Sequence, residues 1–406
     1  MKNIRSTTAL LAAVAATSIA ASAAVVAAPE TSAAAPGQPV QTAPPAAPEA
    51  PTAAPEGAVV VGPGSPIRMP FPDTPIDNGR FISAPSCSLG VPGTVRDENG
   101  NEREVILTAG HCLEAEREIG VGPKVTGDVY VPTPDGDILI GTADVVNMGD
   151  IDDSAILGGP IVLINSMFNQ ADYAFIRPAD GVEVTSISES RDEYGQVHGE
   201  PVQMVGVVDR RTLQPYEIAV DNFGEPICSD GMRTGRNCGY QVFRARHGVW
   251  AVGMGIDHGD SGGNAYDPRT NEVIGVTSMG VGPLSRFQAA DVAIEEAYGI
   301  EDGKVNENFT VTPNNQSQSE FRTLEEDQAY NQEWEAVNGP AYPDQAQEEL
   351  APLPESPAIP FVNAPADFAP QAPAEVAPLV DATNQAVNQA VVDANATMQS
   401  LVGLYN

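Results

Sequence analysis

Short apolar runs separated by turn residues dominate the chain between about residues 66 and 311. Turn residues Asn99-Gly100 stand before EVILTA, Pro134-Asp135-Gly136 stand between VYV and ILIG, and Asp267-Pro268 precedes EVIGVTS. Many short strands joined by such turns indicate an antiparallel barrel or sandwich rather than strands that alternate with long helices. The expected fold class is therefore all-β.

One segment in this region has a different period. In residues 285–299, Phe287, Ala290, Ile294 and Ala297 recur at helical spacing. This spacing predicts a single helix that closes the strand-rich domain.

The first residues have the organisation of an export signal. Lys2 and Arg5 are followed by an apolar stretch over residues 9–20 and by Ala21-Ser22-Ala23, the small-residue pattern that a signal peptidase recognises. We therefore expect a signal peptide over residues 1–23, with an alternative cut after Ala28. An uncleaved anchor is the competing interpretation, because apolar residues continue to Ala28. No later segment is apolar for long enough to span a bilayer, so no membrane span is expected once the signal is removed.

Low-complexity sequence flanks the strand-rich region on both sides. Residues 24–65 are rich in Ala and Pro and predict a linker, while residues 312–406 form an acidic, Pro/Ala-rich tail. Within the tail, apolar residues three, four or seven apart predict one helical face near the end: Val380, Val387, Val391, Ala394, Met398, Leu401 and Tyr405. The expected domain is therefore residues 66–311, and the tail is expected to be a separable targeting or interaction element. Its apolar face could dock on the barrel, on another copy of the chain or on the cell envelope, or it could stay disordered.

Charge and cysteine content narrow the range of functions. The chain has 406 residues and a net charge of -35, so nucleic acid is not an expected partner. Its four cysteines suit the disulfides of an exported protein. Their spacings lack the short paired knuckles of a zinc site, and Asp144, Asp150, Asp152 and Asp153 miss the spacing of a calcium loop. No metal and no cofactor are expected.

Three segments contain residues suited to nucleophilic catalysis. They are VILTAGHC with His111, ADYAFI with Asp172, and GDSGGN with Ser261. A nucleophilic Ser needs a base within hydrogen-bond reach, an anion that orients the base, and backbone N–H groups at the developing oxyanion. Together the three segments offer all of these.

With His, Asp and Ser in this order, and with the motifs TAGHC and GDSGG around His111 and Ser261, the sequence resembles the chymotrypsin-like serine proteases. Within that family it is most similar to the secreted actinobacterial streptogrisins and their relatives. The resemblance covers roughly residues 80–305 and implies two six-stranded antiparallel β-barrels followed by a helix. It implies that His111 is the general base, that Asp172 orients it, and that Ser261 is the nucleophile. It also implies that the N–H groups of Gly259 and Ser261 form the oxyanion hole.

The same resemblance suggests the substrate contacts and the disulfides. Ser278, Met279 and Gly280 match the strand that pairs with substrate backbone, and Gly255 aligns with the base of the specificity pocket. His258, beside the nucleophile loop, either lines that pocket or caps the loop. The implied disulfides are Cys87 with Cys112 and Cys228 with Cys238, one of three possible pairings.

Several positions depart from the family pattern. No Ile-Val-Gly-Gly terminus precedes Cys87, so Asp260 is expected to pair with an internal cation, with Arg233 and Arg236 as candidates. The expected function is a secreted serine endopeptidase that cleaves proteins or peptides through an acyl-enzyme. The alternatives are a catalytically silent binding module with the same fold, or a cell-envelope interaction protein.

Overall fold

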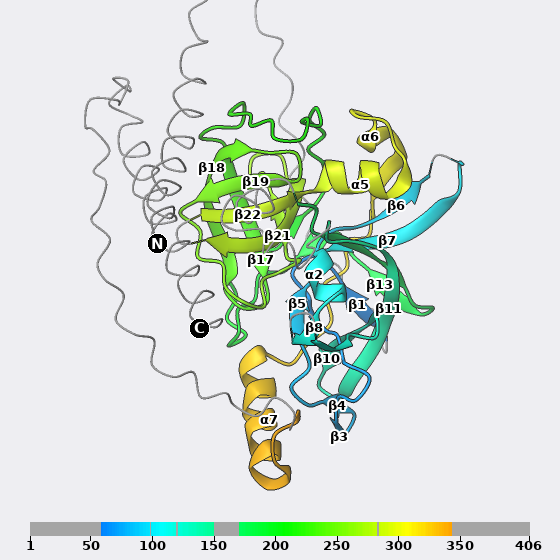
Figure 1. Ribbon diagram of the computed structural model, residues 1–406, viewed down its shortest axis with the longest axis vertical. Coiled ribbons are helices and arrows are strands. Elements are labelled where there is room, and N and C mark those ends of the chain that lie inside the picture. Colours follow the sequence, from blue (N-terminus) through cyan, green and yellow to red (C-terminus); the bar gives the residue numbers. More distant parts are fainter. Residues whose placement is uncertain (1–57, 98, 119–120, 150–169, 282–283, 343–406) are drawn as a thin grey trace, which may run out of the picture. The chain divides into compact units, whose positions relative to one another are not determined.

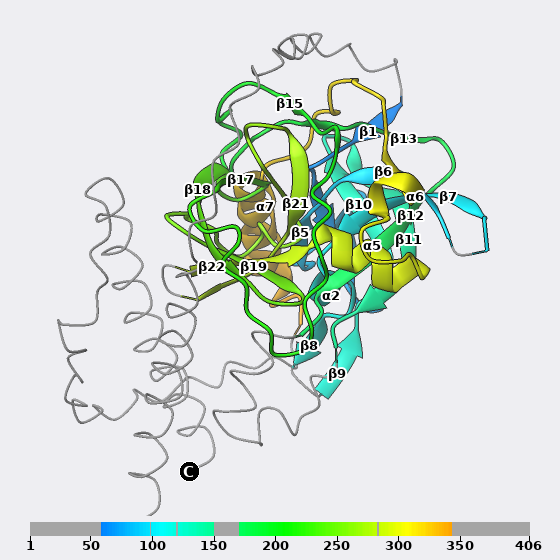
Figure 2. The ribbon, with the colours of Figure 1, turned by 90° about the horizontal axis from the view of Figure 1, so that it is seen from above.

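The computed structural model describes residues 58–97, 99–118, 121–149, 170–281 and 284–342. The predicted signal peptide, most of the predicted linker and the apolar face near the end of the tail lie outside these ranges. Strands dominate the described chain, in two groups that Figure 1 and Figure 2 show side by side. The expected all-β fold of two barrels is confirmed. Among the helices in the described ranges, none has the length and apolarity needed to cross a bilayer.

The first barrel is an eight-stranded sheet in the order β23-β6-β7-β12-β11-β10-β2-β5. The chain from β5 bends through residues 89–91 into β6, and Gly90 N donates to Leu107 O of β7 at 2.8 Å. The continuous segment from β5 to β6 thus contacts β2 at one end and β7 at the other, so the sheet closes on itself. Its strands are β2 (Pro66–Arg68), β5 (Ser86–Ser88), β6 (Pro92–Arg96), β7 (Glu102–Thr108), β10 (Asp128–Thr133), β11 (Gly136–Asn147), β12 (Tyr173–Pro178) and β23 (Phe309–Val311).

The second barrel is a closed ring of six antiparallel strands. The order β21-β20-β17-β18-β19-β22 is closed by an additional pairing of β21 with β22. Its core contains the fully buried Trp250 and Phe287. Its strands are β17 (Pro226–Gly231), β18 (Gly235–Arg244), β19 (Gly248–Val252), β20 (Asn264–Tyr266), β21 (Glu272–Val281) and β22 (Leu284–Ala289).

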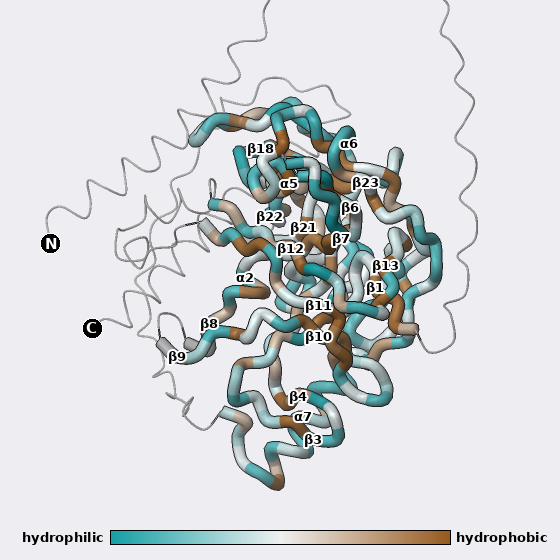
Figure 3. The backbone as a smooth tube through the Cα atoms, turned by 90° about the vertical axis from the view of Figure 1, so that its right-hand side faces the viewer, coloured by the Kyte–Doolittle hydropathy of each residue, from teal (hydrophilic) through white to brown (hydrophobic). Residues whose placement is uncertain are grey.

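Short strands and helices complete the fold. Figure 3 shows that the apolar stretches of the chain follow the barrel strands, for example β10, β11 and β21. The short strands are β1 (Val59–Val61), β3 (Ile76–Asp77), β4 (Arg80–Phe81), β8 (Glu116–Glu118), β9 (Val121–Lys124), β13 (Val182–Val184), β14 (Ile187–Ser188), β15 (Val202–Gln203) and β16 (Gly206–Val207). The helices are α2 (Gly110–Leu113), α5 (Ala290–Tyr298), α6 (Val305–Asn308) and α7 (Leu324–Asn338).

The helix predicted over residues 285–299 is half strand. Residues up to Ala289 belong to β22, and the helix α5 begins at Ala290. β22 pairs with β19 on one edge and with β21 on the other, which satisfies its backbone groups and closes the barrel. These tertiary pairings outweigh the local helical spacing of Phe287 and Ala290.

The predicted domain limits at residues 66 and 311 are too narrow for the packed region. β1 lies inside the predicted linker and pairs with β13. Beyond residue 311, the chain continues against the first barrel as far as Tyr342, which is 8% exposed and packs in the first-barrel core. Arg322, 6% exposed, forms ion pairs with Asp137 at 2.7 Å and with Asp327 of α7 at 2.6 Å. Residues 312–342 are therefore part of the fold.

Candidate active site

His111 is held by two contacts to a single carboxylate. It lies in α2, directly after β7, and its backbone N donates to Asp172 Oδ1 at 2.9 Å. Its ring Nδ1 lies 3.0 Å from Asp172 Oδ2. Asp172 precedes β12, the neighbour of β7 in the sheet, so strand pairing brings these two sequence motifs together. Nδ1 thus faces the carboxylate, and Nε2 is left for a substrate or a nucleophile.

A buried cation lies behind this pair. Ser278 Oγ donates to Asp172 Oδ2 at 2.5 Å, and Arg286 Nη1 donates to Ser278 Oγ at 2.6 Å. Arg286 has no exposed surface and also donates to the carbonyl of Gln170. Burial lowers the pKa of Arg286 to about 10, although the charge of Asp172 opposes this.

The charges of Asp172 and His111 act on each other. Burial alone raises the pKa of Asp172, but the charge and hydrogen bond of His111, the hydrogen bond from Ser278 and the charge of Arg286 bring that pKa well below its ordinary value. Burial alone lowers the pKa of His111, and Arg286 lowers it further. The charge and hydrogen bond of Asp172 outweigh both, so the pKa of His111 is raised above its ordinary value of 6.5.

Ser261 lies on a tight turn that requires glycine at position 262. At Gly262, where φ is +80°, a Cβ would lie 2.1 Å from Thr108 Oγ1 and 2.4 Å from the carbonyl of Ser88. Ser88 N donates to the Ser261 carbonyl at 2.8 Å, which fixes the turn to β5. Within the described residues, the Ser261 side chain forms no hydrogen bond with His111. In unliganded active sites, catalytic hydrogen bonds are often long or poorly aligned.

Two backbone N–H groups of this turn have no acceptor. Among the described residues, neither Gly259 N nor Ser261 N donates a hydrogen bond. Gly259 has a φ of +110°, a backbone conformation that favours glycine. The carbonyl of Gly259 is fixed by Ser88 Oγ at 2.8 Å. The turn therefore leaves two N–H groups beside Ser261 available to an anion.

The expected cation partner of Asp260 is not found in the described part of the chain. The Asp260 carboxylate accepts hydrogen bonds from the backbone N of Arg233, Thr234 and Asp257 at 2.9–3.0 Å and from the Thr234 hydroxyl at 2.8 Å. Arg236 instead pairs with the buried Asp230 at 2.8 Å. Backbone donors can stabilise a buried carboxylate as a cation would. Burial nonetheless raises the pKa of Asp260, and its hydrogen bonds oppose that shift.

A cavity of about 430 Å³ contains the candidate catalytic side chains. His111, Asp172 and Ser261 line it together. Of the predicted substrate contacts, His258, Ser278, Met279 and Gly280 also line it. Gly255 is not among the lining residues, and the neighbouring Ile256 takes its place. The place of Gly255 at the base of the specificity pocket therefore stays a prediction.

Sequence reasoning missed several other residues of this cavity. Met148, Gln170 and Arg286 line it with the predicted residues. Gln170 directly precedes the ADYAFI motif, so its proximity could have been expected. Arg286 lies in residues 285–289, which were predicted to be helical. Its position on β22, beside β21, was therefore not foreseen.

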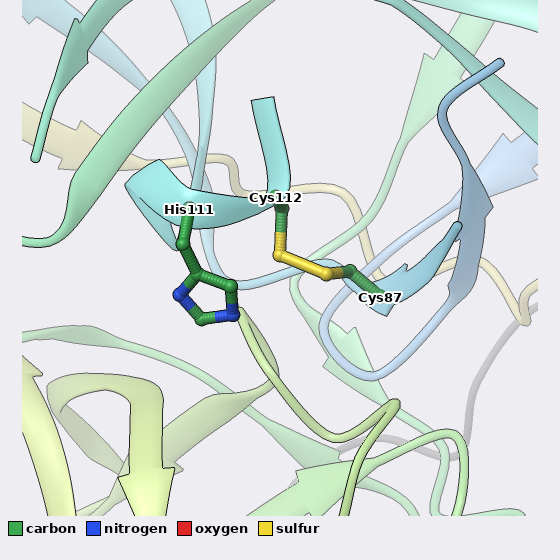
Figure 4. Close-up of side chains that lie close together, drawn as sticks. All are labelled: Cys87, His111 and Cys112. Carbon is green, nitrogen blue, oxygen red and sulfur yellow. A yellow bond between two sulfur atoms is a disulfide. The ribbon is translucent and has the colours of Figure 1, made fainter. Parts of the chain in front are cut away.

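Two disulfides support the site. Cys87 of β5 is bonded to Cys112 of α2, and Cys228 of β17 is bonded to Cys238 of β18, which is the pairing that the family resemblance implied. Figure 4 shows the first bridge beside the His111 ring. Cys87, His111 and Cys112 lie close enough to suggest a metal site. Because the two sulfurs are bonded to each other and Nδ1 faces Asp172, this cluster is a structural bridge.

Only one of the four aspartates considered for a calcium site lies within the described ranges. Asp144 forms ion pairs with Arg103 at 3.4 Å and with Arg177, and the other three aspartates of that group lie outside the described ranges. Arg244 and His247 are each only 7% exposed. Both are therefore buried residues.

Among solved structures, the proteins similar to this chain in fold include several proteases. No protein-family model and no curated protein matches the sequence. Protease A from Thermobifida fusca is 17% identical over 62% of this chain and 98% of that chain, with a TM-score of 0.35. A Nocardiopsis protease is 16% identical over 59% and 97% of the two chains, with a TM-score of 0.34. The chymotrypsin from Cellulomonas bogoriensis is 21% identical over 62% and 98%, with a TM-score of 0.34. The activity of this chain must therefore be inferred from its own side chains.

Proposed function

We propose that the protein is a serine endopeptidase of the chymotrypsin-like family that hydrolyses peptide bonds through an acyl-enzyme. The observation that carries the proposal is the shared cavity. His111, Asp172 and Ser261 line it together, and Asp172 binds both the backbone N and the ring Nδ1 of His111. Beside the cavity, the N–H groups of Gly259 and Ser261 have no acceptor among the described residues. These are the parts that acyl transfer to a serine needs.

The proposed reaction begins when His111 Nε2 takes the proton of Ser261 and Oγ attacks the carbonyl carbon of the substrate. The N–H groups of Gly259 and Ser261 donate to the oxyanion that forms. His111 then gives its proton to the leaving amine, and the C–N bond breaks to leave an ester on Ser261. A water molecule, deprotonated by His111, attacks this ester and releases the acid product.

In this reaction, Asp172 keeps Nδ1–H oriented and stabilises the imidazolium. Its low pKa keeps it ionised over the whole range in which His111 works. Ser278 serves as a positioning residue, since its hydroxyl is occupied by Asp172. Any pairing with substrate backbone is left to the main chain of β21 near Met279 and Gly280.

The pocket chemistry supports a preference for apolar side chains before the cut. Met148, Ile256 and Met279 line the cavity. Its exposed acid, Asp257, lies 3.5 Å from Arg233 Nε, which reduces its value as a partner for a basic substrate side chain. We therefore propose that the enzyme has no strict requirement for Lys or Arg.

We also propose that the enzyme acts outside the cell. The signal-like residues 1–23, with the alternative cut after Ala28, and the two disulfides support export to an oxidising compartment. Because residues 312–342 pack on the first barrel, the proposed contact with the cell envelope is restricted to residues 343–406.

The test is hydrolysis of a peptide library by the purified protein, with the cut sites read by mass spectrometry. Wild type should cut after several apolar residues, and Ser261→Ala should not cut. Hydrolysis that persists in Ser261→Ala would refute the proposed nucleophile. Cutting confined to bonds after Lys or Arg would refute the proposed preference while leaving the mechanism intact.

A further inference from the structure

A second cavity, of about 260 Å³, lies against the turn that precedes Ser261. One wall is α7, through Leu324, Asp327, Gln328 and Asn331. The other lining residues include Phe81 of β4, Ser86 of β5 and the nucleophile-turn residues His258 and Gly259. The helix that the sequence placed in a separable tail therefore borders the candidate active site.

The two cavities share one residue of this turn. His258 lines both of them, whereas Gly259 lines only the second cavity. The first cavity contains Ser278–Gly280 of β21 and the apolar pocket, which suit the part of a substrate that becomes the acyl group. A polypeptide bound there that passes Ser261 is directed over Gly259 toward the second cavity.

The wall formed by α7 is fixed in place. Thr323 and Glu326 form a capping box at its start. Arg68 Nη2 binds Asp327 at 2.8 Å and Arg322 Nε binds it at 2.6 Å, both on buried or nearly buried side chains. The Asp327 carboxylate is therefore occupied by these ion pairs. They hold the cavity-lining face of α7 in position before a ligand binds.

The polar groups left on this wall are amides. Neither Gln328 nor Asn331 makes a side-chain hydrogen bond within the described residues. An amide side chain both donates and accepts, which matches the N–H and C=O groups of an extended peptide. Phe81 and Leu324 add apolar surface beside them.

We propose that this cavity binds the part of a polypeptide substrate that follows the cut bond, with Gln328 and Asn331 as its hydrogen-bonding side chains. This inference rests on the proposed peptidase function. It assigns α7 to substrate recognition and makes the enzyme faster on polypeptides that extend beyond the cut than on substrates that end near it.

The test compares two substrates with the same acyl part. One is a small ester whose leaving group is a single alcohol, and the other is a peptide with four residues after the cut. The variants are Gln328→Ala and Asn331→Ala. The ratio of kcat/KM for the peptide to kcat/KM for the ester should fall about fivefold to tenfold in each variant, as the loss of about one hydrogen bond implies.

Gln332→Ala is the matched control, because Gln332 is an exposed glutamine on the same helix that does not line the cavity. It should keep the ratio of the wild type. If Gln328→Ala and Asn331→Ala keep that ratio as well, this inference is overturned while the peptidase function stands. A folded wild type that hydrolyses neither substrate would overturn the peptidase function, and this inference with it.

Discussion

At the scale of single residues, His111 can act as a base only while its ring is neutral. Its pKa is raised because Asp172 outweighs burial and Arg286, so kcat/KM should fall as the pH drops through a value above 6.5. His258 and Asp257 are the other titratable groups of the cavity. Replacing Arg286 by Met removes a charge that disfavours the imidazolium, so the acidic limb of the profile should move to higher pH. Arg286→Lys, which keeps the charge, should move it less. An acidic limb that stays in place in Arg286→Met would contradict the proposed role of this charge.

Asp172 is the residue that fixes which ring nitrogen of His111 carries the proton. An asparagine there would present an N–H group toward Nδ1 and favour the wrong tautomer. In Asp172→Asn, kcat for a small ester should therefore fall by about 10⁴-fold. Asp135→Asn, in an exposed turn of the first barrel, provides the matched control and should retain wild-type kcat. A kcat for Asp172→Asn within tenfold of the wild type would argue against the triad.

At the scale of elements, α7 depends on one carboxylate. Burial raises the pKa of Asp327, but Arg68 and Arg322 outweigh it and the pKa is lowered, so the ionised form stabilises the fold. Asp327→Asn should lower the free energy of unfolding by about 3 kcal/mol, because the buried guanidinium of Arg68 loses its carboxylate and that of Arg322 keeps only Asp137. This difference should begin to shrink as the pH falls below about 4, where the carboxyl of the unfolded wild type binds a proton, and should vanish once the pH is below the lowered pKa of the folded wild type. Glu325→Gln, exposed on the first turn of the same helix, should change stability by less than about 0.5 kcal/mol in chemical denaturation. Equal stability of the two variants would show that the ion pairs do not anchor α7.

Two elements also show where sequence reasoning succeeded and failed. The motifs around His111 and Ser261 were readable because each combines a strand end with residue types that chemistry requires. Residues 285–289 were misread as helix because their partners in β19 and β21 are distant in the sequence, and local spacing contains no information about them. By contrast, α7 carried a readable signal, the Thr323-x-x-Glu326 capping box, which the acidic composition around it obscured.

At the scale of the whole molecule, the C-terminal limit of the domain can be tested by truncation. A chain that ends after Tyr342 should keep the wild-type thermal midpoint and ester hydrolysis, since it retains every described contact. A chain that ends after Val311 loses Arg322, α7 and Tyr342, so it should unfold at a lower temperature or fail to accumulate. If both chains are equally stable, residues 312–342 contribute nothing to the fold.

The composition of the chain explains why this limit was misplaced. Residues 312–342 are acidic and polar, and such segments are usually excluded from packed cores. Here a few buried groups, among them Arg322 and Tyr342, attach the segment to the first barrel. Composition averages over a segment, whereas the packing depends on single side chains whose partners lie far away in the sequence.

The central claim is that Ser261 is an activated nucleophile, and covalent labelling tests it most directly. The purified protein would be treated with an organofluorophosphonate, digested, and examined by mass spectrometry for the modified peptide. The account predicts one phosphonylated residue, Ser261, with labelling that weakens on acidification as His111 gains a proton and that is lost in Ser261→Ala. A folded wild type that takes up no label, or a label that persists in Ser261→Ala, would contradict it.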